Sequence, residues 1–475
     1  MIRGSLKSVV ATMAASVAMV TVAQAGGFDR GGVNIDLLFD ESRFATEAAV
    51  TYVTPQREIQ NVQRGTNEAT QTAISSQLAP IVGAAGATAT QAEINAFIAA
   101  NPPVNGAIVQ NVSNAVVANF AGAGLNPGPA TTTSIDVDSD YAVPRLGAKV
   151  TVIDNVDCLA SYTEPFGADA DYGTGHAYSA SAVKFSIDTN DYGLTCSYKF
   201  GAGETSLGKA QFRIIGGVSY QELDGFQSRQ RFLDFANLGL ATIGGVTNTA
   251  GVGSFSVDGD AWGWRIGAAY EIPDIALRAQ LIYSSKYEYD LTGIQDNRGF
   301  GAAIPGTAVV PISLTTEIPQ SLEFKLQSGI APGTLAFFNV KWQEWSKLGI
   351  IPIVGGRSPV TGLPTNLSFD PLYQDGWTIT GGLGRQINEQ WSGVFAVTWD
   401  RGTATTSGTQ TDTWTFSGGV SYNHSESVEL RLGGALGVLT SGTSIPTGGD
   451  AANNVSYSFG NDLVAAISGA VRIKF

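Results

Sequence analysis

The last thirteen residues of the chain, residues 463–475, alternate between two kinds of side chain. Every second residue is apolar or small, and Ser468, Arg472 and Lys474 lie between them. An alternation of period two predicts a β-strand with one apolar and one polar face. A soluble sheet can carry such a strand. A final strand that ends on an aromatic residue, here Phe475, is more typical of a transmembrane β-barrel, in which the last strand closes against the first.

The amino-terminal end predicts export from the cytoplasm. A short basic region with Arg3 and Lys7 precedes an apolar stretch, and an A-x-A cleavage motif ends at Ala25. These features predict a secretory signal peptide over residues 1–25 and a mature chain from Gly26; a membrane-anchoring helix is the alternative. No later stretch reaches the ~18 to 20 apolar residues of a spanning helix, so a membrane location requires a closed barrel.

The composition agrees with a barrel and excludes one class of partner. Charged residues make up 14% of the chain, which also contains 58 glycines. That is a low charge content for a soluble protein, whereas a barrel exposes an apolar band to lipid. The formal net charge is -14. Because the chain is acidic and has no basic stripe that could meet phosphates, we expect no nucleic-acid partner.

Cys158 and Cys196 are the only cysteines of the chain. Two thiols in an exported protein suggest one disulfide. Both residues lie near the ends of consecutive predicted strands and share the parity of their apolar neighbours, so a cross-strand bridge is geometrically possible. Two buried free cysteines are the alternative. The only histidines, His176 and His424, do not lie at ligand spacing from these thiols, and no metal site is expected.

From residue 145 onward the chain has the pattern of a series of hairpins with alternately tight and long connections. The predicted strands cover residues 47–54, 145–153, 156–166, 181–200, 209–224, 259–272, 275–292, 315–330, 334–347, 375–388, 391–405, 411–424, 427–441 and 456–475. Their number, about fourteen, is even, as in bacterial single-chain barrels with short periplasmic turns and long outer loops. The sequence therefore predicts an all-β fold, an antiparallel barrel over residues 47–475 with both chain ends in the periplasm.

The longest connection, residues 56–144, differs in composition from the rest of the chain. It is rich in Ala, Gln, Asn and Thr, and residues 68–81 and 91–100 look helical. A Gly/Pro/Thr tract ends it, which marks a loop boundary. We predict a large, partly helical extracellular loop, and a disordered loop is the alternative.

Alternation within the strands predicts which side chains face lipid. In the strand 427–441, apolar Leu430 and Leu432 alternate with charged Glu429 and Arg431. In the strand 275–292, the outward row is expected to continue through Tyr287 and Tyr289. Aromatic rings prefer the headgroup level of a membrane, so these tyrosines and six of the eight tryptophans are expected in interfacial girdles, and a position in the lumen is the alternative for some of them. The six tryptophans expected there are Trp262, Trp264, Trp377, Trp391, Trp399 and Trp414.

The segment that precedes the first strand, residues 26–46, is short, Gly-rich and irregular. It carries six large apolar side chains, Phe28, Val33, Ile35, Leu37, Leu38 and Phe39. A barrel of about fourteen strands encloses a lumen wide enough to need filling or to leave a channel. Because the segment starts in the periplasm, we predict that it enters the barrel and forms a plug.

With a plug, about fourteen strands and this length, the chain resembles the FadL-type family of long-chain fatty acid outer-membrane transporters and their aromatic-hydrocarbon relatives. Residues 164–169, at the outer end of the third strand, resemble the family's aromatic-Gly segment there. Residues 319–326 and 337–346 resemble its paired strands, which end in Trp-Ser. The likeness extends over nearly the whole mature chain. The family's Asn-Pro-Ala signature after the plug is absent, and residues 40–44 occupy that region.

This resemblance implies an outer-membrane channel for passive uptake of hydrophobic compounds, foremost long-chain fatty acids. In the family, an apolar pocket captures the ligand, the plug moves, and the ligand leaves sideways through a break in the third strand's hydrogen bonding. Here Pro165 lacks an amide donor and Gly167 permits a bend, so Pro165, Phe166 and Gly167 are the expected lateral opening. Alternatively, Pro165 simply starts the outer loop.

A fatty acid also needs a partner for its carboxylate. Lumen-facing parity and a mid-strand position favour Arg213, Lys325 and Lys341 for this role. Alternatively, these cations pair with lumen acids such as Glu271, Glu323 and Glu429, because an unpaired charge in a plugged barrel is costly.

The expected partners are hydrophobic small molecules, outer-membrane lipid and lipopolysaccharide, and the barrel-assembly machinery, through Phe475. We expect a monomer in the outer membrane of a Gram-negative bacterium. Neither a cofactor nor enzymatic activity is expected, because His176 and His424 lie in no catalytic motif and no phosphate-binding glycine loop is present. A diffusion porin for small polar solutes and an aromatic-hydrocarbon channel remain as alternatives.

Overall fold

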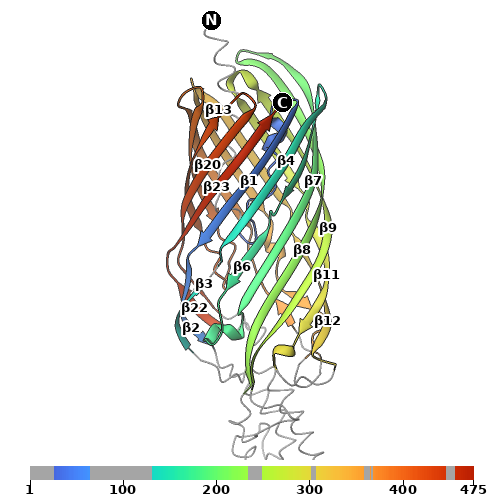
Figure 1. The fold of residues 1–475 in the computed structure, drawn as a ribbon, viewed down its shortest axis with the longest axis vertical. Coiled ribbons are helices and arrows are strands. Elements are labelled where there is room, and N and C mark those ends of the chain that lie inside the picture. The colour runs from blue at the N-terminus through green and yellow to red at the C-terminus, as the bar shows by residue number, and fades with distance from the viewer. Residues whose placement is uncertain are drawn as a thin grey trace, which may run out of the picture.

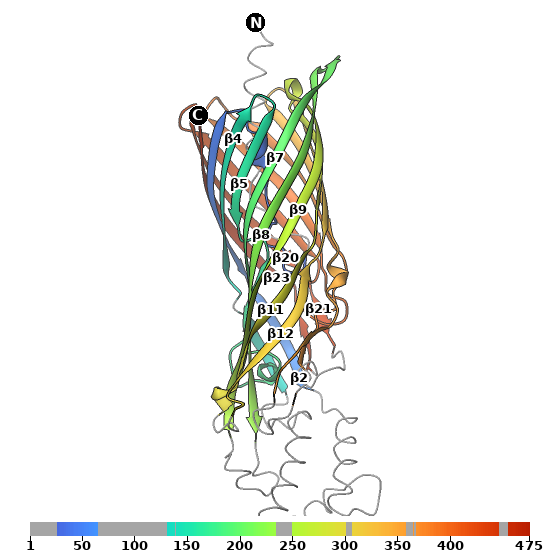
Figure 2. The same cartoon turned by 90° about the vertical axis from the view of Figure 1, so that its right-hand side faces the viewer.

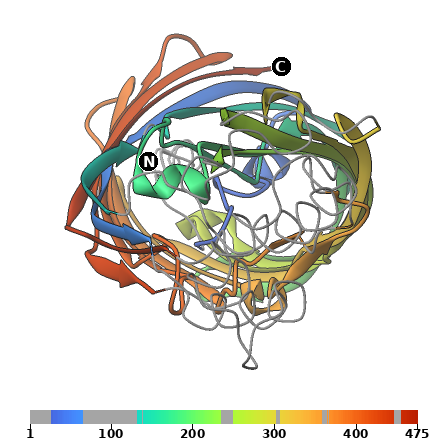
Figure 3. The same ribbon diagram turned by 90° about the horizontal axis from the view of Figure 1, so that it is seen from below.

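The computed structural model describes residues 26–64, 131–137, 139–233, 249–300, 306–357, 364, 367–445 and 455–475. These residues form a closed antiparallel β-barrel (Figures 1 and 2). The barrel sheet contains seventeen strands, but three of them continue a neighbour at the same position of the wall, so the wall has fourteen. The predicted all-β barrel of about fourteen strands is confirmed. Seen from below, the wall is a closed ring (Figure 3).

The wall strands follow one another around the barrel nearly in chain order. They are β1 (Phe44–Pro55), β4 (Tyr141–Ile153), β5 (Val156–Thr163) continued by β6 (Gly167–Asp171), β7 (Lys184–Thr205), β8 (Gly208–Leu233), β9 (Thr249–Ile272), β10 (Leu277–Ser284) continued by β11 (Tyr287–Asp296), β12 (Val309–Ile318) continued by β13 (Ser321–Ala331), β14 (Thr334–Gln343), β17 (Gly376–Gln386), β18 (Trp391–Arg401), β19 (Thr413–Asn423), β20 (Val428–Leu439) and β23 (Asp462–Lys474). The last strand, β23, pairs with β1 and closes the wall.

The two ends of the barrel differ. At the end that holds Phe475, which we call the turn end, strands are joined by turns as short as two residues, for example residues 154–155 and 206–207. Longer connections gather at the opposite end, the loop end. There β8 and β9 continue well beyond the predicted 209–224 and 259–272 and form a long hairpin (Figure 2).

A small separate sheet, which we call the lid, lies at the loop end (Figure 1). It consists of β21 (Gly442–Ser444), β22 (Val455–Phe459), β2 (Arg57–Arg64) and β3 (Thr131–Val137), in that order. The short helix η2 (Ala177–Ala180) packs against it. The ends of the predicted 56–144 loop are thus strands, and its predicted helices at 68–81 and 91–100 lie outside the described residues.

The remaining elements are short. They are η1 (Asp36–Phe39), η4 (Pro273–Ile275), η5 (Arg298–Phe300), η6 (Trp345–Lys347), and the small hairpin of β15 (Ile351–Ile353) and β16 (Leu367–Phe369). In the part of the chain that the structure describes, no helix has the length and the apolar character of a membrane span.

The outer face of the wall is apolar and carries aromatic belts. In β20, Leu432 is 56% exposed whereas Glu429 is 1% exposed, so the predicted alternation of this strand is confirmed. Towards the loop end, Tyr192, Tyr220 and Trp262 stand side by side on three neighbouring strands. A second aromatic group lies nearer the turn end and includes Tyr198, Phe200, Phe212 and Tyr270. Two such girdles flanking an apolar band are the pattern of a barrel in lipid.

The expectation that Tyr287 and Tyr289 face lipid is wrong. They are 7% and 1% exposed and belong to the apolar cluster inside the barrel. The cause is the break between β10 and β11, where the backbone N–H of Ser285 donates to the carbonyl of Trp264. An extra residue at such a break turns all later side chains of a strand to the opposite face.

Candidate functional site

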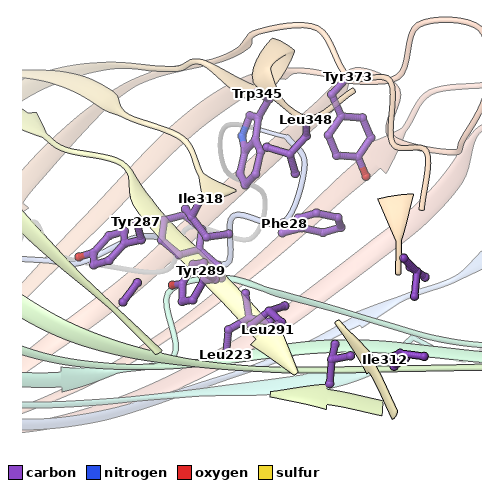
Figure 4. Packing of buried hydrophobic residues seen from close by; sticks show 14 residues of the cluster. Phe28, Leu223, Tyr287, Tyr289, Leu291, Ile312, Ile318, Trp345, Leu348 and Tyr373 are labelled. Atoms are coloured by element: carbon purple, nitrogen blue, oxygen red, sulfur yellow. The ribbon is translucent and has the colours of Figure 1, made fainter. Parts of the chain in front are cut away.

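An apolar cluster fills the lumen towards the loop end (Figure 4). Its buried members are Phe28, Phe166, Leu223, Val257, Ala261, Tyr287, Tyr289, Leu291, Ile312, Ile318, Trp345, Leu348, Ile353 and Tyr373. Phe28 comes from the segment before the first strand and packs edge-on against Trp345, with 5.7 Å between ring centroids, and 5.6 Å from Tyr373. Each such aromatic pair contributes about 0.5–1.5 kcal/mol beyond area burial. Phe28 is therefore both a member of this apolar site and an anchor of its own segment.

Two cavities adjoin Phe28. The smaller has a volume of about 60 Å³ and an almost wholly apolar lining that includes Phe185, Leu291 and Phe369. The larger, which we call the outer chamber, has a volume of about 410 Å³ and extends from residues 26–30 to the lid. Its lining includes the tyrosines Tyr141, Tyr172, Tyr178, Tyr373 and Tyr457. Concave, mostly apolar spaces with a few polar groups are the usual form of small-molecule sites.

The tyrosines of the lid side give the outer chamber aromatic faces with neutral hydroxyl groups. The ring centroids of Tyr172 and Tyr178 are 4.5 Å apart, and Tyr178 meets Tyr457 edge-on at 5.4 Å. Burial raises the pKa of Tyr172 and Tyr178 above the ordinary tyrosine value, so both phenols stay uncharged at neutral pH. This lining suits a ligand that is largely apolar and offers few hydrogen-bonding groups.

A third cavity, the inner chamber, has a volume of about 180 Å³ and is lined by residues 31–36 of the N-terminal segment. Five cationic side chains line it, and they are Arg145, Arg265, Arg278, Lys325 and Lys341. Only two acidic side chains, Asp36 and Glu323, do so. Since residues 26–30 line the outer chamber and residues 31–36 the inner one, the N-terminal segment lies between the two.

Apolar contacts hold the N-terminal segment in the lumen. Ile35, Leu37 and Leu38 are buried in a second cluster with wall residues such as Leu159 and Ile215. Val33 and Phe39 pack against the same cluster, and Phe28 belongs to the first one. The structure thus places all six predicted plug side chains inside the barrel.

Three carboxylates of the segment add ionic contacts to the wall. Asp29 pairs with Lys341, and Asp36 lies 3.5 Å from Lys325 and 3.4 Å from Arg278. Asp40 lies 3.5 Å from Arg472 (Asp40 Oδ2 to Nη1). Burial raises the pKa of Asp36, but the charges of Lys325 and Arg278 outweigh burial, and its pKa lies below the ordinary 3.8. Asp36 therefore stays ionised across the physiological range.

The three predicted carboxylate-binding cations are all engaged within the protein. Arg213 contacts Asp157 at 2.9 Å and Glu271 at 3.2 Å. Lys325 and Lys341 contact the acids of the N-terminal segment described above, and Lys325 also lies 3.7 Å from Glu323. Sequence reasoning foresaw Glu271 and Glu323 as partners but missed Asp29 and Asp36. The sequence did carry a signal for these two partners. Both are acidic residues that lie between the apolar residues of a segment expected to fill the lumen, and the lumen walls were expected to carry cations.

The third wall strand is broken at the predicted lateral opening. β5 ends at Thr163 and β6 begins at Gly167, so the strand resumes beyond Pro165. The pairing of β4 with β5 ends at Arg145↔Thr163, and β6 pairs with β7 alone among the described strands. Between β4 and β6 the ladder of the wall is therefore interrupted, and we call this place the gap.

The N-terminal segment supplies the missing backbone contacts on the lumen side of the gap. The backbone N–H of Arg30 donates to the carbonyl oxygen of Pro165 at 2.9 Å. The backbone N–H of Gly167 donates to the carbonyl oxygen of Phe28 at 2.7 Å. Phe166 is itself 7% exposed and belongs to the apolar cluster around Phe28. Pro165, Phe166 and Gly167 are thus in direct contact with the segment predicted to be the plug.

The two cysteines lie on the other flank of the third strand. Cys158 of β5 stands opposite Cys196 of β7, and the structure joins them by a disulfide. Their neighbours Leu194 and Tyr198 are exposed on the outer face of the wall. The disulfide therefore faces outward, between the two strands that remain paired.

The chain matches the model of one protein family, described as "Outer membrane protein transport protein (OMPP1/FadL/TodX)", over residues 77–437. No curated protein matches it. A FadL homologue from Pseudomonas aeruginosa has a similar solved structure, with a TM-score of 0.64, 14% sequence identity, and coverage of 96% of this chain and 99% of that one. The solved structure of the CymD monoaromatic hydrocarbon channel is also similar, with a TM-score of 0.50 and 13% sequence identity. The match covers 93% of this chain and 90% of that one. At these identities the likeness shows the fold.

Proposed function

Because the chain belongs to the OMPP1/FadL/TodX family of outer membrane transport proteins, we propose that it takes up long-chain fatty acids by passive diffusion. The family consists of channels for hydrophobic compounds in the outer membrane of Gram-negative bacteria, not of enzymes. In this proposal the turn end faces the periplasm and the loop end faces the outside. Residues 1–25 are removed as a signal peptide, and residues 26–46 act as the plug.

The observation that carries the proposal is the position of Phe28. This plug side chain occupies the apolar cluster that a captured ligand would need, next to both loop-side cavities. Burying apolar surface contributes about 25 cal/mol per Å², or about 0.8 kcal/mol per methylene. A long acyl chain can therefore compete with the ring of Phe28 for this site. Displacing Phe28 would loosen the plug, because the backbone of the same residue contacts Gly167 at the gap.

The exit that we propose is lateral. Displacement of the plug removes the backbone partners of Pro165 and Gly167, and Phe166 is then free to leave the lumen. The gap lies next to the loop-side aromatic belt, since Thr163 follows Tyr162, whose ring is 5.3 Å from that of Tyr192. A ligand that leaves here enters the membrane near the headgroup level.

The carboxylate of the fatty acid is met by Lys341 first, with Arg213 and Lys325 as further candidates. Lys341 lines the inner chamber, whereas its partner Asp29 lines the outer one. The ion pair thus lies where a ligand would pass from one chamber to the other. A ligand carboxylate replaces Asp29 charge for charge, so the exchange avoids leaving a cation unpaired in the lumen.

The experiment that tests this function is lipid analysis of the purified protein. Mass spectrometry of the detergent-solubilised barrel should find co-purified fatty acids, and cells that express it should take up labelled oleate faster than cells with an empty vector. A barrel without bound lipid that conducts ions steadily in planar bilayers would instead be a diffusion porin. That outcome contradicts the proposal.

A second candidate ligand, an aromatic hydrocarbon, has one observation in its favour. Phe185 and Phe369 are stacked with 5.4 Å between centroids and 19° between ring planes, and Phe28 stacks on Phe369 at 6.2 Å. Flat aromatic molecules fit between such faces. Competition of toluene with oleate for binding to the purified barrel distinguishes the two substrates.

The proposed environment of the barrel is lipid and lipopolysaccharide around a monomer. We also propose that Phe475 is the contact of the assembly machinery. Phe475 is 73% exposed, and its ring centroid lies 5.9 Å from that of Phe44 on the first wall strand. Replacement of Phe475 by Ala should lower the amount of barrel in the outer membrane without changing ligand binding by the fraction that is assembled.

A further inference from the structure

The side chain of Arg30 occupies the gap in the wall. Arg30 belongs to the plug, yet its guanidinium lies where a side chain of Gly167 would begin: a Cβ built on Gly167 would be 2.3 Å from Arg30 Cζ. On the β4 side, the guanidinium lies over the ring of Tyr141, 4.6 Å from its centroid. Arg30 therefore fills the space between β4 and β6 that no backbone hydrogen bond bridges.

The carboxylates that hold Arg30 belong to β6 and β7, on the opposite side of the gap from Tyr141. Arg30 pairs with Asp169 of β6 and with Asp188 of β7, the latter at 3.1 Å. Asp188 alternates with Thr189, which is fully buried in the lumen, so Asp188 projects from the outer face. Its side chain is 46% exposed, whereas that of Arg30 is 3% exposed. The guanidinium thus reaches into the wall, where Asp188 binds it from the outer face.

We propose that Arg30 is a positioning residue that locks the gap, so that plug release and lateral opening are one event. The inference rests on the proposed function, because only a laterally released ligand needs this gap. While Arg30 is in place, its contacts with Asp169 and Asp188 on one side and Tyr141 on the other join β6 and β7 to β4. When the plug moves, Arg30 leaves with it, and the two carboxylates repel each other.

The lock also requires a glycine at position 167, independently of the ion pairs of Arg30. Its backbone conformation is not one that needs glycine, since no positive φ is recorded for it. What requires glycine is the guanidinium itself, which occupies the place of a Cβ. A methyl group at position 167 should expel Arg30 without touching its charge or its carboxylate partners. An alanine at Gly216 is the matched control, because a Cβ there meets no atom within 4 Å.

The test measures the width of the gap in the absence of ligand. Spin labels at Ala142 of β4 and Asp171 of β6, both exposed, report the distance across the gap by pulsed electron paramagnetic resonance in nanodiscs. We expect Arg30→Met and Gly167→Ala to lengthen and broaden the distance distribution relative to the wild type. Arg30→Lys should keep most of the wild-type distribution, because it retains the charge, and Gly216→Ala should not change it.

The inference is overturned if Arg30→Met and Gly167→Ala both keep the wild-type distribution while heat-modifiable gel migration shows folded barrels. Asp169→Asn combined with Asp188→Asn provides a further check, since removing both acceptors should reproduce the effect of Arg30→Met. Failure of the proposed function would be visible elsewhere, as absence of oleate binding to the wild-type protein. A protein that binds oleate but has an unaltered gap in Arg30→Met retains the function and excludes the lock.

Discussion

Two junctions of the barrel wall differ in what closes them. At the junction of β1 and β23, eleven consecutive residue pairs run from Ala45↔Lys474 to Pro55↔Val464 without interruption. At the gap between β4 and β6, the backbone ladder is missing and a plug segment stands in for it. A junction closed by backbone hydrogen bonds opens only by unfolding. A junction closed by a segment that is not part of the wall opens when that segment moves.

Deletion of residues 26–40 is expected to have the largest effect, because it removes the plug from the lumen and Arg30 from the gap. We expect a barrel that still closes through β1 and β23 but conducts ions at a high and steady level, whereas the intact protein conducts little. Planar-bilayer recording checks this. Unchanged conductance would mean that residues 26–40 do not block the lumen.

Replacement of Glu47 by Ala should weaken the closed junction instead. Glu47 accepts hydrogen bonds from Arg472 at 2.5 and 2.8 Å, and Arg472 is 1% exposed. Breaking a buried ion pair by removing one partner costs about 3–5 kcal/mol. The temperature at which the barrel loses its heat-modifiable gel migration should fall. The gap distance should stay as in the wild type, and a change there would show that the two junctions are not independent.

Removal of the disulfide should lower the stability of the barrel by a smaller amount. The effect should be confined to the other flank of the third strand, where β5 pairs with β7. A cross-link of this kind stabilises by about 2–4 kcal/mol. The double variant Cys158→Ala, Cys196→Ala should unfold at a lower temperature because β5 and β7 are no longer joined. It should not widen the gap on the β4 side. Mass spectrometry of the non-reduced wild-type protein establishes whether the disulfide forms in the cell envelope.

Lys341→Ala should affect ligand passage more than the stability of either junction. A hydrogen bond to a charged group contributes about 1.5–3 kcal/mol, so fatty-acid uptake should fall by about tenfold or more. Uptake of a neutral hydrocarbon should be unaffected. Arg213→Ala is the comparison, because Arg213 lies deeper, between Asp157 and Glu271. Equal losses for acid and hydrocarbon would contradict a carboxylate role for either residue.

Acidification should have the smallest effect. The pKa of Asp36 is lowered in the folded protein, so the contribution of this residue to plug docking is fully present above pH 3.8, its ordinary pKa. It is lost only as the pH falls through the lower folded value. Conductance should therefore remain low from pH 7 to pH 5. A rise in that range would mean that another group controls the plug, and Asp36→Asn would then leave the pH profile unchanged.

The wall was predictable from local sequence, because a strand between lipid and lumen must alternate with period two. The same rule gave the wrong face where one extra residue, between β10 and β11, interrupts the alternation. Nothing local distinguishes Ser285, which ends the alternation of β10, so Tyr287 and Tyr289 were assigned to the wrong face. The lid was not predictable either, since β2 pairs with β22 across nearly the whole sequence, and residues 442–455 read only as a loop.

The candidate site was predictable as a region but not as contacts. The apolar residues of the N-terminal segment indicated a plug, and Pro165 with Gly167 indicated a break in the third strand. The role of Arg30 had no signal in sequence, because it depends on a missing side chain at Gly167. The fit of a long side chain into the space left by a glycine can be recognised only once the backbone positions are known.

The lid has a consequence for how the protein is made. Its central pair, β2 and β22, joins residues 59–64 to residues 455–459. One follows the first wall strand and the other precedes the last, so the pair cannot form until synthesis is almost complete. A half-inserted barrel would expose an uncovered mouth to the outside, and resistance of residues 57–64 to added protease would mark the molecules that have finished assembly.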